Sequence, residues 1–334
     1  MSERVRPPRV TIGMPTYNRA RLLVESVKMV LAQTYEDFEL IICDDGSTDD
    51  TLARLKEIDD PRVAVLSFDN RGPPHPLNEV AQRTRGEYFI ILHDHDLFDP
   101  ELIARSVAAL DAFPEAHFVV QGSAWVAEDG VSHHRPNPLP LQPLTDGVAF
   151  GRNVLSQAYH QGFPIHACCM IRRRSFERVG FFYRPSAGWY ADIDTSLRLL
   201  HLGAFAHIDK ELFRFRIRDP DHALARDFRL TYNTLFSVFE EHTAIFFADD
   251  PHQQRTQLRA LRQARQRFLS GALLHALARG DVDGFRQALA VADRDMPGGL
   301  SRFGVSALVR CPATHRPLSV LAKTLNTARK RFRR

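Results

Sequence analysis

Apolar runs of strand length alternate with amphipathic segments along the first two-thirds of the chain. The runs expected to form strands are residues 10–15, 38–45, 63–68, 87–96, 118–126 and 165–171. Apolar positions at helical spacing predict helices over residues 20–33, 78–84 and 172–179, and within 188–203. Strands that alternate with helices in this way indicate an α/β fold built on a parallel sheet.

The pattern changes near residue 221, after which helical periodicity continues almost throughout. The whole chain has a formal net charge of +4, but residues 222–334 contain 19 Lys and Arg against 9 Asp and Glu, so residues 1–221 are net acidic. We therefore expect three parts: a disordered tail over 1–9, an α/β domain over 10–221 and a basic helical region over 222–334. A basic region suits phosphates or an anionic membrane surface. Nucleic acid is not expected as a partner, because no recognition fold accompanies the arginines.

Composition is that of a globular protein, with 44% hydrophobic and 25% charged residues. No apolar stretch reaches the roughly 18–20 residues that a transmembrane helix needs. The basic start MSERVRPPR lacks the apolar core of a secretory signal. The four cysteines form no CxxC pair, so reduced thiols are expected rather than zinc or disulfides. These features favour a cytoplasmic protein.

Carboxylates follow two of the expected strands at the point where each apolar run ends. Asp44 and Asp45 end one run, and Asp94 and Asp96 end another. Ligands of parallel α/β sheets collect beyond the carboxyl ends of the strands. The sequence therefore predicts a ligand site at this edge.

The four consecutive residues His93-Asp94-His95-Asp96 suggest a metal site. If the strand continues through them, Asp94 and Asp96 share one face and His93 and His95 the other. Paired carboxylates bind hard cations such as Mg²⁺ or Mn²⁺, and imidazole suits Mn²⁺ better. The alternative is an acidic loop that caps a helix starting at Asp99-Pro100.

Three ordered segments resemble a known family. They are PTYNRARLLVESVKMVLAQTYEDFELIICDDGSTDD (15–50), GEYFIILHDHDLFDPELI (86–103) and YADIDTSLRLLHLG (190–203), followed by FRFR (213–216). Together they resemble the family 2 glycosyltransferases, from Val10 to about Arg218. The resemblance implies a GT-A (Rossmann-like) fold: a mixed, mostly parallel sheet flanked by helices, here with a helical C-terminal region. It also implies a nucleotide-sugar donor.

The resemblance assigns a donor site. Tyr17 matches an aromatic residue that stacks near the nucleotide base, and Asp45 a carboxylate that accepts a hydrogen bond from a pyrimidine ring. Asp94 matches a residue near the ribose and the metal. The full set of nucleotide-sugar-binding candidates is Pro15, Tyr17, Asn18, Asp44, Asp45 and Asp94.

The metal segment departs from the family pattern, because His95 stands where the family has its usual metal-binding aspartate. Three possibilities stay open: His95 itself ligates Mn²⁺, Asp94 and Asp96 form a pair shifted by one position, or metal dependence is weak. The metal candidates are thus Asp94, His95 and Asp96, with Mn²⁺ or Mg²⁺ as the cofactor.

Asp192 matches the family's catalytic base, although Ala191 stands before it where the family often has Glu. The alternative for Asp192 is a helix cap, and Asp194 is the expected helix N-terminal partner. Trp189 and Tyr190 are acceptor-side candidates, with core packing as the alternative. Arg216 and Arg218 are candidates for contact with the diphosphate. A single base facing away from the leaving group implies inversion at the anomeric carbon.

The function implied is an inverting, metal-assisted glycosyltransferase that acts on a cell-surface glycan or lipid-linked saccharide, in polysaccharide biosynthesis. The alternatives are a metal-dependent phosphohydrolase and a catalytically weak sugar-nucleotide-binding module.

The last stretch, residues 317–334, places apolar positions on one helical face and basic positions mostly elsewhere. Such a helix can lie on an anionic membrane. Packing on the catalytic domain with a solvated tail is the favoured interpretation, and peripheral contact at the inner face of the membrane through the basic C-terminus is the alternative.

Overall fold

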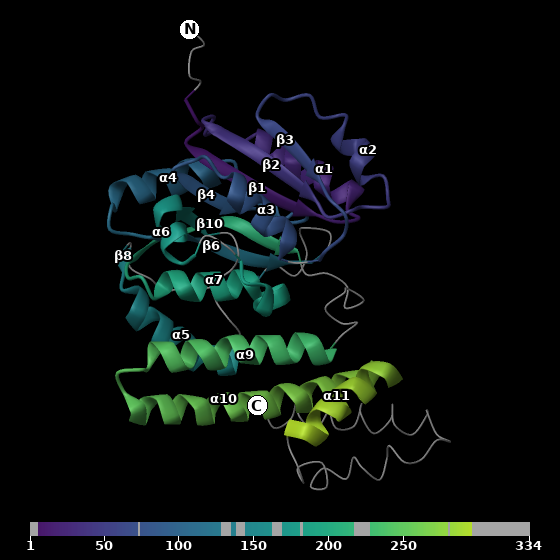
Figure 1. Cartoon of the computed structure of the whole chain (residues 1–334), viewed down its shortest axis with the longest axis vertical. Coiled ribbons are helices and arrows are strands. Elements are labelled where there is room, and N and C mark those ends of the chain that lie inside the picture. Colours follow the sequence, from purple (N-terminus) through teal and green to yellow (C-terminus); the bar gives the residue numbers. More distant parts are fainter. Residues whose placement is uncertain are drawn as a thin grey trace. The chain divides into compact units, whose positions relative to one another are not determined.

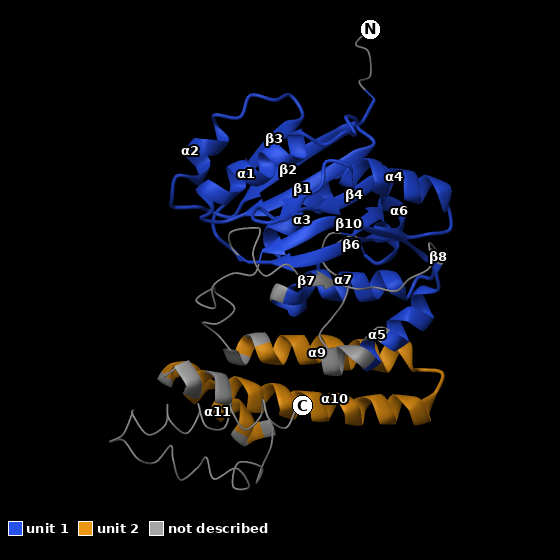
Figure 2. Ribbon diagram, turned by 180° about the vertical axis from the view of Figure 1, so that it is seen from behind, with its two compact units in different colours: residues 1–219 blue, residues 220–334 orange. Residues whose placement is uncertain are grey.

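A computed structural model of the chain describes residues 6–72, 74–127, 135–137, 144–161, 169–180, 183–216, 228–279 and 281–295. The chain divides into two compact units, residues 1–219 and 220–334 (Figure 2). Each unit is described by itself below. The segment 317–334, for which packing on the catalytic domain or membrane contact was predicted, and Arg218 lie outside the described residues.

The first unit is built on one mixed sheet (Figure 1). Its strands are β1 (Val10–Thr16), β2 (Phe38–Asp44), β3 (Val63–Ser67), β4 (Tyr88–Ile91), β5 (Leu97–Phe98), β6 (Phe118–Val126), β7 (Arg135–Asn137), β8 (Leu144–Thr145), β9 (Met170–Arg172) and β10 (Phe205–Arg216). The spatial order is β3-β2-β1-β4-β9-β6-β10-β5, with β7 beside β6 and β8 beside β10. The four strands from β3 to β4 are parallel, and the short β9 runs antiparallel to both β4 and β6.

Helices cover both faces of this sheet. They are α1 (Ala20–Leu31), α2 (Thr51–Leu55), α3 (His75–Arg83), α4 (Leu102–Ala112), α5 (Gly147–Gln161), α6 (Arg173–Arg178), the 3₁₀ helix η1 (Pro185–Tyr190) and α7 (Ala191–Leu200). Alternate residues of β1 divide between the faces. Ile12 and Met14 join the core formed with α1 and α4, whereas Gly13 faces α3. The apolar alternation along the strands thus specifies a three-layer arrangement.

Gly13 is required by the close approach of α3 to β1. A Cβ atom at this position would lie 2.5 Å from Val80 Cγ1 and 2.7 Å from Ile91 Cδ1. Interiors are packed to crystal-like density, so neither neighbour can retreat without cost. The contact matters for the site because the first residue of α3, His75, faces the carboxyl end of β2.

Two of the expected strands differ from those observed. The strand expected over 87–96 ends at Ile91, and residues 92–96 form a turn before the two-residue β5. The assignment of Asp94 and Asp96 to one strand face and of His93 and His95 to the other is therefore wrong. The strand expected over 165–171 is observed as β9 at 170–172, and residues 162–168 lie outside the described part.

The second unit contains α9 (Phe228–Phe246), α10 (Pro251–Arg279) and α11 (Val282–Asp295). Tyr232 and Phe236 of α9 pack against Phe268 of α10 in tilted and edge-on contacts, each with ring centroids 5.9 Å apart. Within the described ranges, no helix is long and apolar enough to cross a membrane.

We expect Gly13→Ala to lower the free energy of unfolding by about 1–3 kcal/mol, because overpacking a full core forces neighbours to shift. Gly271→Ala in α10 is the control, since its Cβ meets nothing within 4 Å. Alanine there should be neutral or stabilising by up to about 1 kcal/mol. Urea denaturation followed by circular dichroism measures both, and an unchanged Gly13→Ala midpoint would contradict the packing described.

Candidate functional site

The carboxyl ends of β1, β2 and β4 meet at one edge of the sheet, because the three strands are parallel and in register. Thr16, the last residue of β1, connects the other two. Its carbonyl oxygen accepts a hydrogen bond from Asp45 N at 3.0 Å, and its Oγ1 donates to Asp94 Oδ2 at 2.7 Å. The sequence prediction that Asp45 and Asp94 share one edge agrees with this geometry.

Asp44 and Asp45 hold the loops that follow β2 and β3. The Asp44 side chain is fully buried and accepts from Ser47 N at 3.2 Å and Ser67 Oγ at 3.0 Å. The Asp45 carboxylate accepts from Arg71 N at 3.1 Å and Gly72 N at 2.8 Å. Both carboxylates therefore order the loops that border the edge.

His75 is a residue of this edge that the sequence analysis did not find. Its Nδ1 lies 3.5 Å from Asp45 Oδ1, and its Nε2 lies 3.4 Å from Glu79 Oε1. The ring also meets Phe68 edge-on, with centroids 5.3 Å apart. No motif surrounds His75, so only the packing of α3 against β2 identifies it.

The turn that contains Tyr17 lies beside the loop of residues 47–49. Asn18 has a positive φ of 51°, and its Oδ1 accepts from Thr48 N at 2.7 Å. Pro15 is part of β1, paired with Cys43. Tyr17 is 45% exposed, which leaves its ring available to a flat ligand.

The turn after β4 brings together the three metal candidates. His95 Nδ1 lies 2.8 Å from Asp94 Oδ1, and His95 Nε2 lies 3.5 Å from Asp96 Oδ1. Asp96 Oδ1 also accepts from Arg216 N at 3.1 Å. The imidazole thus lies between two buried carboxylates. Within the described part of the chain, no three or more His, Cys, Asp or Glu side chains form a group that could hold a metal ion.

Asp94 is held in its charged form. Burial raises the pKa of this carboxyl, but the hydrogen bond and charge of His95, the charge of Arg19 and the hydroxyl of Thr16 outweigh burial and lower the pKa below its usual value. Arg19 Nε lies 3.9 Å from Asp94 Oδ2. Neither Thr16 nor Arg19 was predicted to take part, although both belong to or border the PTYN motif.

Arg216 contacts this turn through Asp96 and also binds Glu25 of α1. The guanidinium of Arg216 donates to Glu25 Oε1 at 2.6 Å. In the part of the chain that the structure describes, its buried Nε has no hydrogen-bond partner. The diphosphate contact expected for Arg216 stays a prediction, with one donor atom available for it.

Asp192 and Asp194 lie in the first turn of α7 but in different environments. Asp194 is fully buried and forms ion pairs with Arg184 and Arg198, the latter with Nε 3.0 Å from Oδ2. No described residue forms such an ion pair with Asp192; its Oδ1 accepts a hydrogen bond from Ile193 N at 2.8 Å. Burial raises the pKa of Asp192 to about 6, although backbone N–H groups partly oppose this shift.

The segment that carries Asp192 is tied to α3. Asn78 donates Nδ2 to the carbonyl oxygen of Tyr183 at 2.8 Å and accepts Tyr183 N at 2.6 Å. Residues 183–190 lead directly into α7, through η1, which contains Trp189 and Tyr190. Burial, and then the charge of Asp192, raises the pKa of Tyr190 to about 12. Helix α3 therefore contacts Asp45 at one end and positions the Asp192 segment along its length.

A family model described as "Glycosyl transferase family 2" matches residues 11–180. An uncharacterized glycosyltransferase of Rickettsia typhi is 24% identical over 315 residues, which cover 92% of each chain. The succinoglycan biosynthesis protein ExoO of Rhizobium meliloti is 27% identical, over 81% of this chain and 82% of that one.

Two solved structures share the fold. The first is S. aureus TarS 1-349 in complex with UDP-GlcNAc, with a TM-score of 0.59, 13% identity and coverage of 94% of this chain and 89% of that one. The second is the mannosyltransferase PcManGT of Pyrobaculum calidifontis in complex with GDP-Man and Mn²⁺. Its TM-score is 0.51, with 20% identity and coverage of 96% and 86%.

The contrast between Asp192 and Asp194 predicts opposite effects of the same substitution on stability. Asp194→Asn leaves Arg184 and Arg198 without their buried counter-charge and should cost about 3 kcal/mol at any pH from 5 to 8. Asp192 binds its proton more tightly when folded than when unfolded. As the pH rises from about 4 to about 6, the unfolded chain loses this proton before the folded chain does, so the free energy of unfolding falls. Below pH about 4 both states keep the proton, and this loss is absent.

Asp192→Asn removes that cost and should stabilise the chain by about 1 kcal/mol at pH 8, with no gain at pH 4. Chemical denaturation of both variants at the two pH values measures this. A loss of stability in Asp192→Asn that grows with pH would show that Asp192 is a structural carboxylate like Asp194.

Proposed function

The chain belongs to glycosyl transferase family 2 and is a glycosyltransferase, and from this premise we propose that it transfers a sugar from a nucleoside-diphosphate donor to an acceptor hydroxyl with inversion, using Asp192 as general base. The family resemblance predicted from the sequence is thus confirmed, as is the mixed α/β fold shared with GT-A glycosyltransferases. The mechanism, the residue roles and the substrate belong to the proposal.

The observation that carries the proposal is the place of Asp192 in the first turn of α7, where no cationic side chain of the described residues pairs with it. A general base works best when its pKa is near the working pH, and a carboxyl of ordinary pKa is a weak base at pH 7. Burial raises the pKa of Asp192 to about 6, which strengthens it as a base while leaving it mostly ionised at neutral pH. Asp194 cannot act as the base in the same way, because its carboxylate is ion-paired with Arg184 and Arg198.

In the proposed reaction, Asp192 accepts the proton of the acceptor hydroxyl while that oxygen attacks the anomeric carbon and the bond to the nucleoside diphosphate breaks. Retention would need a second carboxylate as nucleophile. The neighbouring Asp194 cannot take that role while Arg184 and Arg198 hold both of its oxygens. Trp189 and Tyr190, immediately before α7, are the proposed contacts to the acceptor.

The donor nucleotide is proposed to bind at the shared edge of β1, β2 and β4. The exposed ring of Tyr17 offers a stacking surface for a base, and Asp45 offers carboxylate oxygens to a pyrimidine N–H. The shape of this site would depend on Pro15, Asn18 and Asp44. Asn18 and Asp44 accept hydrogen bonds from the loop of residues 47–49 beside it. The relatives TarS and PcManGT, in complex with UDP-GlcNAc and GDP-Man respectively, support this donor class.

The turn after β4 carries the ligand types that a divalent metal uses, although its side chains do not form a metal-binding group in the described part of the structure. Asp94 is kept ionised, Asp96 adds a second carboxylate, and the imidazole of His95 suits Mn²⁺ better than Mg²⁺. Asp94 and Asp96 would hold the ion, with His95 as the nitrogen ligand. A bound divalent ion supplies positive charge against the diphosphate as the bond breaks. Arg216, whose Nε has no hydrogen-bond partner among the described residues, would add a donor to the same group.

The acceptor is proposed to be a growing polysaccharide or its lipid-linked precursor, because relatives such as ExoO are named for polysaccharide biosynthesis.

We also propose that the second unit contacts an anionic membrane surface from the cytoplasmic side. Helix α10 contains six arginines and no acidic residue. Arg255, Arg259 and Arg262 recur at helical spacing on its exposed side.

Asp192→Asn should lower turnover by about 10²–10⁴-fold, the usual contribution of a general base, and leave donor binding nearly unchanged. Release of nucleoside diphosphate from a panel of sugar nucleotides measures turnover, and calorimetry measures donor binding. Asp59→Asn, an exposed carboxylate in the loop before β3, is the control. Full turnover in Asp192→Asn would remove Asp192 from the mechanism. Phosphate release without sugar transfer would favour a phosphohydrolase.

The triple substitution of Arg255, Arg259 and Arg262 by Gln should weaken co-sedimentation of the full chain with anionic vesicles by about 100-fold. The reason is that each basic residue near an anionic surface contributes about 1 kcal/mol. The matched control replaces three exposed arginines of the first unit, Arg21, Arg54 and Arg105. Equal losses in the two variants would mean that total charge, and not α10, determines the contact.

A further inference from the structure

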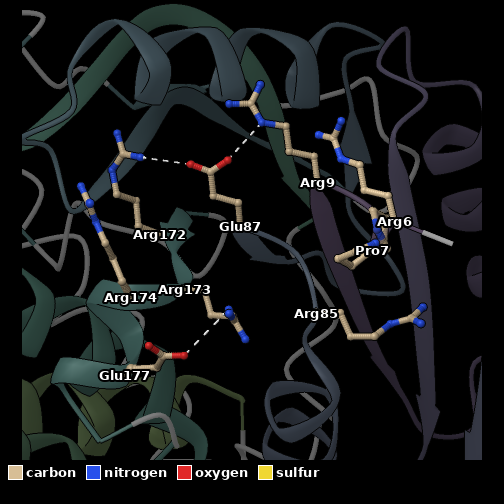
Figure 3. Close-up of a pocket in the computed structure, with 10 residues that line it drawn as sticks. Arg6, Pro7, Arg9, Arg85, Glu87, Arg172, Arg173, Arg174 and Glu177 are labelled. Carbon is tan, nitrogen blue, oxygen red and sulfur yellow. Dashed lines mark hydrogen bonds and ion pairs between the residues drawn. The ribbon is translucent and has the colours of Figure 1, made fainter. Parts of the chain in front are cut away.

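A cavity of about 360 Å³ lies at the opposite edge of the sheet from the candidate active site. It is formed where β1 and β4 begin and where the antiparallel β9 ends, since Val10 pairs with Tyr88 and Tyr88 with Arg172. Six arginines line it: Arg6, Arg9, Arg85, Arg172, Arg173 and Arg174. Figure 3 shows Arg172, Arg173 and Arg174 on one side and Arg6, Arg9 and Arg85 on the other. Nothing in the proposed transfer reaction uses this edge.

Two of the arginines are fixed in place by the core. Arg172 is 6% exposed and donates to the carbonyl oxygens of Ala116 at 2.8 Å and Phe113 at 3.1 Å, and to Tyr88 Oη at 3.2 Å. Arg9 donates to Asp111 Oδ1 at 2.5 Å, and the Tyr88 hydroxyl donates to the same oxygen at 2.6 Å. Positive charge is therefore held at the back of the cavity without a rearrangement on binding.

The acidic residues of the lining do not balance this charge. Only two are present, Glu87 and Glu177. Glu87 lies between Arg9 and Arg172, at 3.2 and 3.8 Å, and Glu177 lies 3.8 Å from Arg173 Nε. Each carboxylate is thus already shared with a lining arginine. Carboxylates outside the lining pair with three more of them: Arg85 with Glu39, Arg9 with Asp111 and Arg6 with Asp37. Among the described residues Arg174 has no carboxylate partner, so the lining arginines still exceed the carboxylates that contact them.

The arginines nearer the opening of the cavity form the weakest interactions with other residues of the chain. Arg174 donates to the carbonyl oxygen of Pro114 at 3.0 Å, which satisfies a donor but neutralises no charge. The Arg6 side chain is 80% exposed and lies 3.9 Å from Asp37.

We propose that this cavity binds a phosphate-bearing anion, separately from the donor site and independently of the transfer reaction. Its volume falls within the range of small-molecule pockets, roughly 300–1,000 Å³. The planar guanidinium group matches phosphate oxygens in bidentate geometry, and it keeps its charge at any physiological pH. Arg173 and Arg174 reach the anion from one wall and Arg6 from the other, beside the fixed guanidinium groups of Arg9 and Arg172, while Arg85 stays paired with Glu39.

The test is calorimetric titration of the full chain with inorganic pyrophosphate in the absence of divalent ions. The double substitution Arg173→Gln with Arg174→Gln should weaken binding by at least about tenfold, because it removes two charge-assisted hydrogen-bonding groups. Arg178→Gln, on the same helix but outside the lining, is the matched control and should change the affinity little. Arg6→Gln, on a side chain too exposed to affect folding, provides a second variant and should also weaken binding.

Pyrophosphate bound at the donor edge instead would be weakened by Arg216→Gln, which removes the proposed diphosphate donor, and unaffected by the cavity variants, and that pattern overturns the proposal. Equal affinity in the wild-type chain and both cavity variants overturns it as well. A lipid phosphate presents the same chemistry as a free anion, so a parallel arm uses vesicles of phosphatidic acid in phosphatidylcholine. Vesicle binding that the Arg173/Arg174 substitutions reduce, with no pyrophosphate binding, identifies a lipid headgroup as the ligand. No effect of the substitutions in either arm rejects the site.

Discussion

One residue, Thr16, joins the ends of the three central strands, and the candidate active site depends on it. Its carbonyl oxygen binds Asp45 N after β2, and its hydroxyl binds the Asp94 carboxylate after β4. The parallel register of β1 with both neighbours brings these groups to one edge, because a shift by a single residue would turn the side chains to the opposite face. The register is in turn set by buried apolar residues on both faces of β1, with Gly13 allowing α3 to approach.

Acidic residues close together in sequence have different tasks in this fold. Asp194 gives both oxygens to Arg184 and Arg198, so it anchors α7 and stays charged. Asp192, two residues earlier, is partly buried and has no cationic partner among the described residues, and burial raises its pKa to about 6. The difference in partners, not in residue type, separates the structural carboxylate from the proposed base. A similar contrast holds across the sheet at the edge opposite the donor site, where arginines paired with carboxylates line one cavity with Arg174, which has no carboxylate partner among the described residues.

Much of this fold could be predicted from sequence, because its central strands are continuous apolar runs that end at charged residues. The β2 strand and the Asp44-Asp45 pair are an example: the run ends abruptly, and the site begins there. The turn at residues 92–96 could not be predicted in the same way. Leu92 is fully buried and continues the apolar run of β4, yet the strand has already ended, so the alternation of side chains is lost. His75 and Thr16 gave no chemical signal of their own, since their roles arise from packing between segments distant in the chain.

The central claim is that one nucleoside diphosphate binds at the edge formed by β1, β2 and β4, with its reactive end toward Asp192. A crystal structure of the full chain with a nucleoside diphosphate and Mn²⁺ tests this most directly. The account predicts the base between Tyr17 and Asp45, the diphosphate beside Asp94, His95 and Asp96, and Asp192 across the gap from it. A nucleotide found in another cavity, or bound with Asp192 directed away from its phosphates, would contradict the account.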